Sequence, residues 1–279
     1  MSLPHPIRKR RLPLSEKESK MAILERSDTG AVAHLKLNAP ERMNALSNEM
    51  IAALQSQFDS LKDDNSIRVV VLSANGKAFC AGHDLKQMTA ARQNQDAGKA
   101  AFADLFARCS QMMLSIRALP QPVIAVPHGI ATAAGCQLVA SCDLAVAEAG
   151  TRFGVNGVNI GLFCSTPMVA LSRNIPRKHA FEMLTTGAFI SAERAAELGL
   201  VNRVAVGAEA KALKMAELIA SKLGAAVKIG KQAFYQQGEM SLEDAYAFTG
   251  DVIVENMLYR DTEEGIAAFL EKRDPDWNQ

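Results

Sequence analysis

Two segments of the sequence each place small residues directly before a predicted helix. They are residues 69–85 (VVVLSANGKAFCAGHDL) and residues 123–138 (VIAVPHGIATAAGCQL). Each begins as a buried strand, and the turn that follows leaves backbone N–H groups unpaired at a helix start, where the dipole favours negative charge. Small residues also let a ligand approach the backbone closely. Two such donors that converge on one oxygen would stabilise an oxyanion or enolate, and one donor lowers a barrier by roughly 2.7–4 kcal/mol.

The pattern around these turns predicts strands and helices that alternate, followed by helices alone. Strands are expected at residues 31–37, 67–72, 123–126 and 144–147, and helices at 48–61, 97–118, 134–139, 167–173, 177–186 and 192–198. This order predicts an α/β core over residues 21–204 and a helical C-terminal subdomain over residues 205–279. Residues 1–20 carry basic residues and prolines without an amphipathic period, which indicates a disordered or tag-like tail, with a transit peptide as the alternative.

Composition narrows the classes of partner. The 31 basic residues are balanced by 30 acidic ones, so the net charge gives no reason to expect nucleic acid as a binding partner. No apolar run is long enough to predict a membrane span. The sequence has five cysteines, an odd number, and no two of them have CxxC spacing. They predict free thiols in a reducing compartment, the cytoplasm or alternatively the mitochondrial matrix, and no metal site.

Several ordered motifs carry a family resemblance. The main ones are Asn38-Ala-Pro-Glu-Arg-Met-Asn-Ala-Leu-Ser, Phe79-Cys-Ala-Gly-His-Asp-Leu, Gly129-Ile-Ala-Thr-Ala-Ala-Gly-Cys-Gln-Leu and Ser141-Cys-Asp. Through them the chain resembles the enoyl-CoA hydratase/isomerase family, also called the crotonase family, over residues 22–276. The resemblance implies a crotonase-like ββα spiral core, an acyl-CoA substrate that brings coenzyme A with it, no other cofactor, and a homotrimer or dimer of trimers.

The resemblance also implies roles for individual residues. The backbone N–H groups of His83 and Ala134 would hold the thioester carbonyl, and Gln137 would contact the reacting carbon or its water. Further substrate contacts are expected from the following residues: Ala81, Asp84, Leu85, Lys86, Gly157 and Lys272. For Lys272, expected near the coenzyme phosphates, a solvated helix face is the alternative.

The sequence departs from the family pattern at both catalytic carboxylates. Gln137 and Gly157 stand where typical hydratases of the family have glutamates. A positioned acid or base contributes about 10²–10⁴-fold, and glutamine cannot exchange a proton near neutral pH although it can orient a water. The His83 imidazole is the candidate replacement, since histidine titrates near neutral pH, and Asn156 and Asn159 could hold a water.

Three functions are therefore open. The first is a lyase or isomerase of hydratase type that stabilises a thioester enolate, with Gln137 or His83 in place of the carboxylate. The second is a non-catalytic acyl-CoA-binding module, which the loss of both carboxylates favours. The third is a thioester hydrolase or decarboxylase. It ranks last because Cys136 and Cys164 have no histidine near them in sequence and are expected to be buried core residues.

Overall fold

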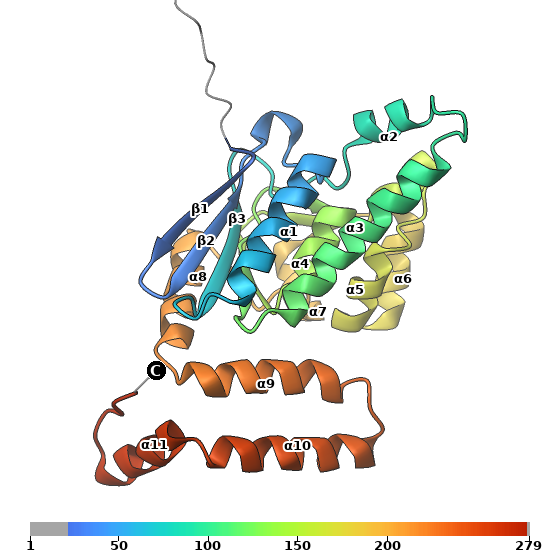
Figure 1. Ribbon diagram of the computed structural model, residues 1–279. Coiled ribbons are helices and arrows are strands. Elements are labelled where there is room, and N and C mark those ends of the chain that lie inside the picture. The colour runs from blue at the N-terminus through green and yellow to red at the C-terminus, as the bar shows by residue number, and fades with distance from the viewer. Residues whose placement is uncertain (1–21, 278–279) are drawn as a thin grey trace, which may run out of the picture.

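The structure is a computed structural model that describes residues 22–277. The prediction of a tail over residues 1–20 lies outside the described residues. Figure 1 shows an α/β body formed by the first part of the chain and a group of helices below it formed by the last part.

The body is built on a six-stranded sheet. Its strands, in spatial order, are β1 (Leu24–Thr29), β2 (Val32–Leu37), β3 (Val69–Ala74), β4 (Val123–Ala125), β6 (Leu144–Glu148) and β9 (Arg203–Ala205). The pair β1 and β2 is antiparallel, and the other pairs are parallel. Every residue of β3 is buried, and burial on both faces is why this strand reads as a continuous apolar run.

Short strands form a second, three-stranded sheet beside the first. They are β5 (Ile130–Thr132), β7 (Arg152–Gly154) and β8 (Ile190–Ser191). The chain passes from β4 to β5 and from β6 to β7, so that it alternates between the two sheets, with α4 (Ala134–Ser141) after β5. This confirms the expected spiral of ββα units. The turn expected between the strand at residues 123–126 and the helix that begins at 134 is only part of what forms there, because the segment also contains β5.

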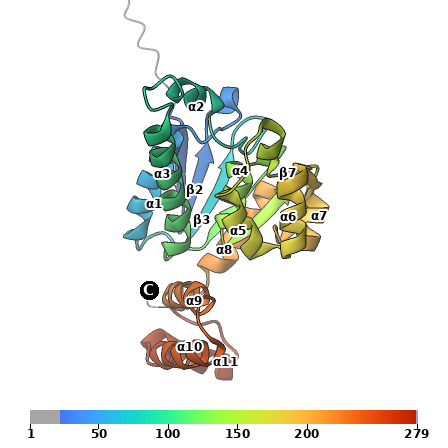
Figure 2. The ribbon, with the colours of Figure 1, turned by 90° about the vertical axis from the view of Figure 1, so that its right-hand side faces the viewer.

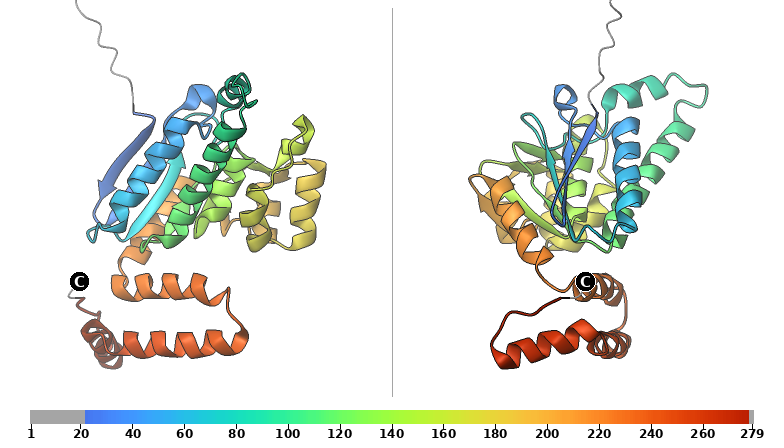
Figure 3. Two further views of the ribbon diagram at one scale, coloured as in Figure 1. Left: turned by 45° about the vertical axis from the view of Figure 1, so that its right-hand side comes forward. Right: turned by 60° about the vertical axis from the view of Figure 1, so that its left-hand side comes forward.

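Helices cover both faces of the larger sheet. On one face lie α1 (Asn48–Lys62) and α3 (Lys99–Ala118), and on the other lies α8 (Ala208–Ala220), as Figures 2 and 3 show. Alternate residues of β3 serve the two faces: Val70 belongs to the core under α1 and α3, whereas Val71 packs with the alanines of α8. This alternation is the side-chain period of a strand.

The remaining elements complete the chain. They are α2 (Leu85–Ala91), α5 (Pro167–Asn174), α6 (Arg177–Thr186), α7 (Ala192–Leu198), α9 (Gly224–Gln237), α10 (Leu242–Met257), α11 (Arg260–Glu271) and the 3₁₀ turns Pro40–Arg42 and Asn156–Ile160. The expected helices that start after Ser47 and Ser191 are confirmed, and each serine oxygen accepts a backbone N–H of the first turn. This capping contact explains why both helices begin where they do.

The last three helices form a separate group, of which α10 and α11 bury almost nothing within the described residues. Helix α10 has no buried residue, and α11 buries only Ala268 among its described residues. Large apolar side chains on this pair are exposed, including Tyr246, Ile253 and Phe269. Helix α9 connects this group to the body through the buried side chain of Lys231, and Trp277, which follows α11, donates its indole N–H to the Ser221 carbonyl at the end of α8 at 3.1 Å.

Candidate functional site

The two small-residue loops of the sequence lie side by side and are hydrogen-bonded to each other. The backbone N–H of Cys80 donates to the Ile130 carbonyl at 3.2 Å, and the N–H of Thr132 donates to the Cys80 carbonyl at 3.0 Å. Residues 79–84 are thereby held beside β5 and the start of α4. The loops thus meet at one place although they are about fifty residues apart in the sequence.

Two glycines allow this close approach. A Cβ at Gly82 would lie 3.0 Å from the Ala133 Cβ and 3.5 Å from the backbone nitrogen of Ala134. A Cβ at Gly135 would lie 2.2 Å from the Cys80 carbonyl oxygen, which no side chain can tolerate. The first loop therefore runs directly over the first residues of α4, and the amides of residues 83 and 134 belong to the same small region.

The two predicted donors are the backbone N–H groups of His83 and Ala134. Neither has a backbone acceptor among residues 22–277. Ala134 is the first residue of α4, where an N–H has no partner within the helix. The residue before it, Ala133, has φ 50° and ψ −120°, a conformation that favours glycine and costs of order 1–3 kcal/mol for other residues. Its own N–H donates to the Gly154 carbonyl at 2.9 Å, which holds this turn in place.

The rest of the first loop is also fixed by hydrogen bonds. Ala81 donates its N–H to the Met43 carbonyl at 3.1 Å. The Asp84 carboxylate caps α2 by accepting the N–H groups of Lys86 and Gln87 at 2.9 and 3.2 Å. Leu85 and Lys86 are exposed in the first turn of α2. The expected substrate contacts at residues 81–86 therefore share one loop, with the side chains of 85 and 86 at the surface.

The His83 side chain turns toward α1 and α3. Its Nδ1 lies 3.4 Å from the Leu46 carbonyl oxygen, and its ring meets the edge of Phe106 with centroids 5.4 Å apart. Burial lowers the pKa of His83, and the contact with the Leu46 carbonyl opposes this only partly. The imidazole is therefore neutral near pH 7, and its buried Nε2 has no hydrogen-bond partner among the described residues.

Gln137 lies one turn after Ala134 on the same face of α4, since residues three apart on a helix are neighbours. The side chain is buried, and its Oε1 has no partner within residues 22–277. An unpaired buried carbonyl group is costly, roughly 1–3 kcal/mol. A ligand group or water that donates to Oε1 would remove this cost.

Gln137 also lines a cavity of about 540 Å³ between α3, α4, α5 and α9. Among the predicted site residues, Gln137 alone lines this cavity. Apolar walls come from Met113, Leu114, Ala140, Val169, Ala170 and Phe234. The cavity thus begins one helical turn from the Ala134 amide and offers space for an apolar chain.

The structure leaves no room for a glutamate at position 157. A Cβ at Gly157 would lie 2.6 Å from the Leu162 carbonyl oxygen and 2.9 Å from the Cys164 sulfur. Both neighbours are held in place, since the N–H of Leu162 donates to the Gly157 carbonyl at 2.9 Å and Cys164 is buried. The second carboxylate has therefore been lost together with the space for its side chain.

Gly157→Ala should accordingly destabilise the protein by about 1–3 kcal/mol, as overpacking typically does. Gly230→Ala is a matched control, because a Cβ at this helical glycine meets nothing within 4 Å and alanine favours a helix by roughly 1 kcal/mol. Urea unfolding of the two variants would compare them. Equal stability of Gly157→Ala and the natural protein would show that the loop relaxes freely.

The structure does not bring Lys272 to this region of its own chain. Lys272 directly follows α11, and Figure 1 shows α11 at the opposite end of the molecule from α2. The residue ends its helix in a left-handed conformation, with φ 57°. Within one chain, Lys272 is thus separated from the other predicted contacts.

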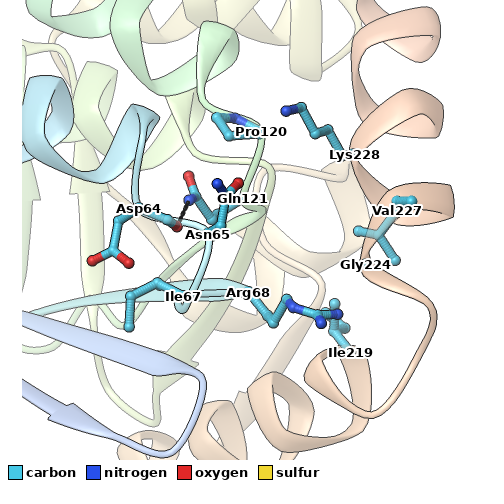
Figure 4. Close-up of a pocket in the computed structure, with 11 residues that line it drawn as sticks. Asp64, Asn65, Ile67, Arg68, Pro120, Gln121, Ile219, Gly224, Val227 and Lys228 are labelled. Atoms are coloured by element: carbon cyan, nitrogen blue, oxygen red, sulfur yellow. Dashed lines mark hydrogen bonds between the residues drawn. The ribbon is translucent and has the colours of Figure 1, made fainter. Parts of the chain in front are cut away.

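A second cavity, of about 300 Å³, lies between the end of α1 and the start of α9 (Figure 4). Gln121 crosses its edge, and its Nε2 donates to the Asp64 carbonyl at 3.1 Å. The Arg68 guanidinium packs against Gly224, where a Cβ would lie 2.2 Å from Nη1. None of the predicted site residues lines this cavity, so it is separate from the two loops.

The described cysteines do not form a reactive group. All five are free and buried. Burial raises the pKa of Cys136 to about 12 and also raises that of Cys164, so both are thiols near neutral pH and weak nucleophiles. Over residues 22–277 there is no cluster of three or more metal-binding side chains, and no helix is both long and apolar enough to cross a bilayer.

Comparison with known proteins defines the class. The family model of enoyl-CoA hydratase/isomerase matches residues 27–279, and the chain belongs to this family, as the motifs predicted. It is 45% identical over 249 residues to human enoyl-CoA hydratase domain-containing protein 3, mitochondrial, covering 88% of this chain and 80% of the relative.

Solved structures agree with this assignment. An enoyl-CoA hydratase of Mycobacterium smegmatis superposes with a TM-score of 0.88 at 53% identity, over 92% of this chain and 99% of that one. The human domain-containing protein 3 superposes with a TM-score of 0.87 at 43% identity, over 91% and 100% of the two chains. The predicted crotonase-type fold is therefore confirmed.

Proposed function

We propose that this protein binds an acyl-CoA thioester and stabilises its enolate, with hydratase-like lyase chemistry as the reaction. The single observation that supports this most is the pair of loops that meet at Gly82 and Ala134, each with an amide that has no backbone acceptor among the described residues. Two N–H groups directed at one carbonyl oxygen stabilise negative charge better as it develops, which is what an enolate requires. Coenzyme A enters as part of the substrate, and no other cofactor is proposed.

In this proposal Gln137 takes the place of the usual base in orienting water. Its Oε1, which has no partner among the described residues, can accept a hydrogen bond from a water beside the β-carbon of the bound enoyl group. An amide cannot remove the proton that the reaction requires. The reaction should therefore be slow, because the roughly 10²–10⁴-fold contribution of general acid–base catalysis is absent.

A non-catalytic acyl-CoA-binding module is the second candidate, and the crowding at Gly157 favours it. If the packed loop at Gly157 excludes one carboxylate and the Gln137 amide replaces the other, the protein would still bind an acyl-CoA but would not turn it over. The His83 imidazole faces Leu46 and Phe106, which gives it no direct path to a proton on the acyl group.

Two measurements test these candidates together. Calorimetric titration with crotonyl-CoA should show binding under either candidate, and absence of binding would refute both. Prolonged incubation with crotonyl-CoA, followed by separation of the 3-hydroxybutyryl product, distinguishes them. Product above the uncatalysed rate supports the lyase, and binding without product supports the module.

We further propose assembly as a homotrimer or dimer of trimers. The exposed apolar side chains of α10 and α11 support this, since solvent exposure of so many is unfavourable for a monomer. In such an assembly Lys272 could contact coenzyme phosphates held by a neighbouring subunit. For location we propose the cytoplasm, with the mitochondrial matrix as the alternative suggested by the names of the vertebrate relatives.

A further inference from the structure

Arg117 lines the cavity between α3, α4, α5 and α9 and has no acidic partner in the part of the chain that the structure describes. Its guanidinium carbon lies 4.4 Å from the centre of the Tyr235 ring, a cation–π contact. No hydrogen bond or ion pair is formed by its N–H groups within residues 22–277. A guanidinium offers five donors in a planar arrangement that matches a carboxylate. These donors remain available to a ligand.

The acidic residues beside the same cavity are already engaged. Asp143 accepts the ammonium of Lys231 at 2.7 Å, the Tyr235 hydroxyl at 2.7 Å and the Val123 N–H at 2.6 Å. Glu239 faces Arg173, with 4.0 Å between its Oε1 and the arginine Nε. Asp143 is therefore neutralised by Lys231 and Glu239 by Arg173. The positive charge of Arg117 remains uncompensated in the cavity.

Arg117 lies at the end of the cavity away from the oxyanion loops. Ala134 starts α4, whereas Asp143 follows its last turn and binds Tyr235, on which Arg117 stacks. The eight residues of α4 span roughly 12 Å. Between the two ends the cavity walls are mainly apolar, from residues of α3, α4 and α5. The cavity thus reaches Gln137, one helical turn from the Ala134 amide, at one end, is apolar in the middle and carries the Arg117 cation at the other.

We propose that the acyl chain occupies this cavity and that Arg117 binds a carboxylate at the far end of the chain. This rests on the acyl-CoA binding proposed above and narrows it to coenzyme A thioesters of medium-chain dicarboxylic acids. The thioester carbonyl lies at the His83 and Ala134 amides, the methylenes pass Gln137 and the apolar walls, and the terminal carboxylate accepts the Arg117 donors. A chain that ends in a methyl group gains the apolar contacts but leaves the guanidinium unpaired.

Calorimetric titration of the full chain tests this with matched pairs of ligands. Adipoyl-, suberoyl-, sebacoyl- and dodecanedioyl-CoA would each be compared with the monomethyl ester of the same length, which lacks only the terminal charge. At the length that reaches Arg117, the free acid should bind about ten-fold more tightly, as expected for a charged hydrogen bond. Arg117→Met should remove that preference. Arg108→Met should leave it intact, because Arg108 is paired with Asp104 away from the cavity.

The possible outcomes separate this inference from the proposed function. Equal binding of acid and ester at every length would overturn the assignment of dicarboxylic chains while leaving acyl-CoA binding in place. A preference that survives in Arg117→Met would overturn the role of Arg117. Absence of binding by all the thioesters would overturn the proposed function as well. The comparison of acid with ester in the natural protein needs no variant and so holds even if Arg117→Met folds poorly.

Discussion

Replacement of Lys231 by methionine is expected to lower the free energy of unfolding by about 3–5 kcal/mol, the usual cost of removing one partner of a buried ion pair. The Lys231 ammonium donates to Asp143 at 2.7 Å and to the carbonyls of Ile116 and Gln121 at 2.9 Å each. All three of its donors are thus used. Burial lowers the pKa of Lys231 and the Asp143 carboxylate opposes this, so the charge depends on that partner.

The variant leaves the largely buried Asp143 carboxylate without a cation. It also frees α9, which Lys231 holds against the ends of α3 and α4, so the cavity wall should loosen together with the loss of stability. Urea unfolding followed by circular dichroism at a fixed protein concentration measures the effect. Concentration must be held constant because any assembly of subunits would add to the apparent stability.

Two controls identify the mechanism. Lys228→Met changes an exposed lysine on the same helix and should shift stability by no more than about 0.5 kcal/mol. The double variant Lys231→Met with Asp143→Asn should be more stable than Lys231→Met alone, because it removes the unpaired charge. A loss below about 1 kcal/mol in Lys231→Met would mean that water enters and solvates Asp143.

The sequence predicts the loops well because their chemistry is local. Glycine and alanine residues beside a helix start can be read directly from the sequence. The structure has no space for a Cβ at Gly135, and Gly82 adopts φ +94°, which favours glycine. The order of buried strands and helices was equally visible. The apolar run at β3 and the serine cap at Ser47 each rest on interactions within a few residues.

Other features depend on contacts that sequence spacing does not show. The strands β5, β7 and β8 have two or three residues, too few for a period, and form only because the spiral brings them together. Lys231 and Asp143 are 88 positions apart, and a lysine in a helical pattern normally indicates an exposed face. Arg117 likewise reads as an ordinary residue near the end of a helix. The unbalanced positive charge of Arg117 in the cavity can be recognised only once the structure shows which cations pair with Asp143 and Glu239.

Position 157 shows why a motif position and a site are different things. The sequence gives a glycine where the family has a glutamate, which by itself suggests that the change could be reversed. The structure places the Leu162 carbonyl and the Cys164 sulfur where the new side chain would begin. A second carboxylate would thus need a rebuilt loop, whereas position 137 already has a side chain of glutamate's length.

Gln137→Glu is therefore the variant expected to raise activity most, with hydration of crotonyl-CoA increased about 10²-fold or more, within the range of one acid–base group. The new carboxyl would occupy the buried place of Gln137, one turn from the Ala134 amide. Burial should raise the pKa of the new carboxyl toward neutrality, where a carboxyl can both accept and return a proton. Arg117 and Arg173 of the same cavity lining act in the opposite direction.

The measurement is the rate of loss of the enoyl thioester at saturating crotonyl-CoA, with binding affinity determined in parallel. Gln111→Glu makes the same chemical change at an exposed position on α3 and should leave the rate unchanged. Gln137→Leu keeps the volume without a polar group and should abolish any activity of the natural protein. If Gln137→Glu binds crotonyl-CoA as tightly as the natural protein and still shows no increase in rate, the amides of His83 and Ala134 do not hold the thioester carbonyl within reach of position 137. In that case the site would bind coenzyme A in a geometry unrelated to enolate chemistry.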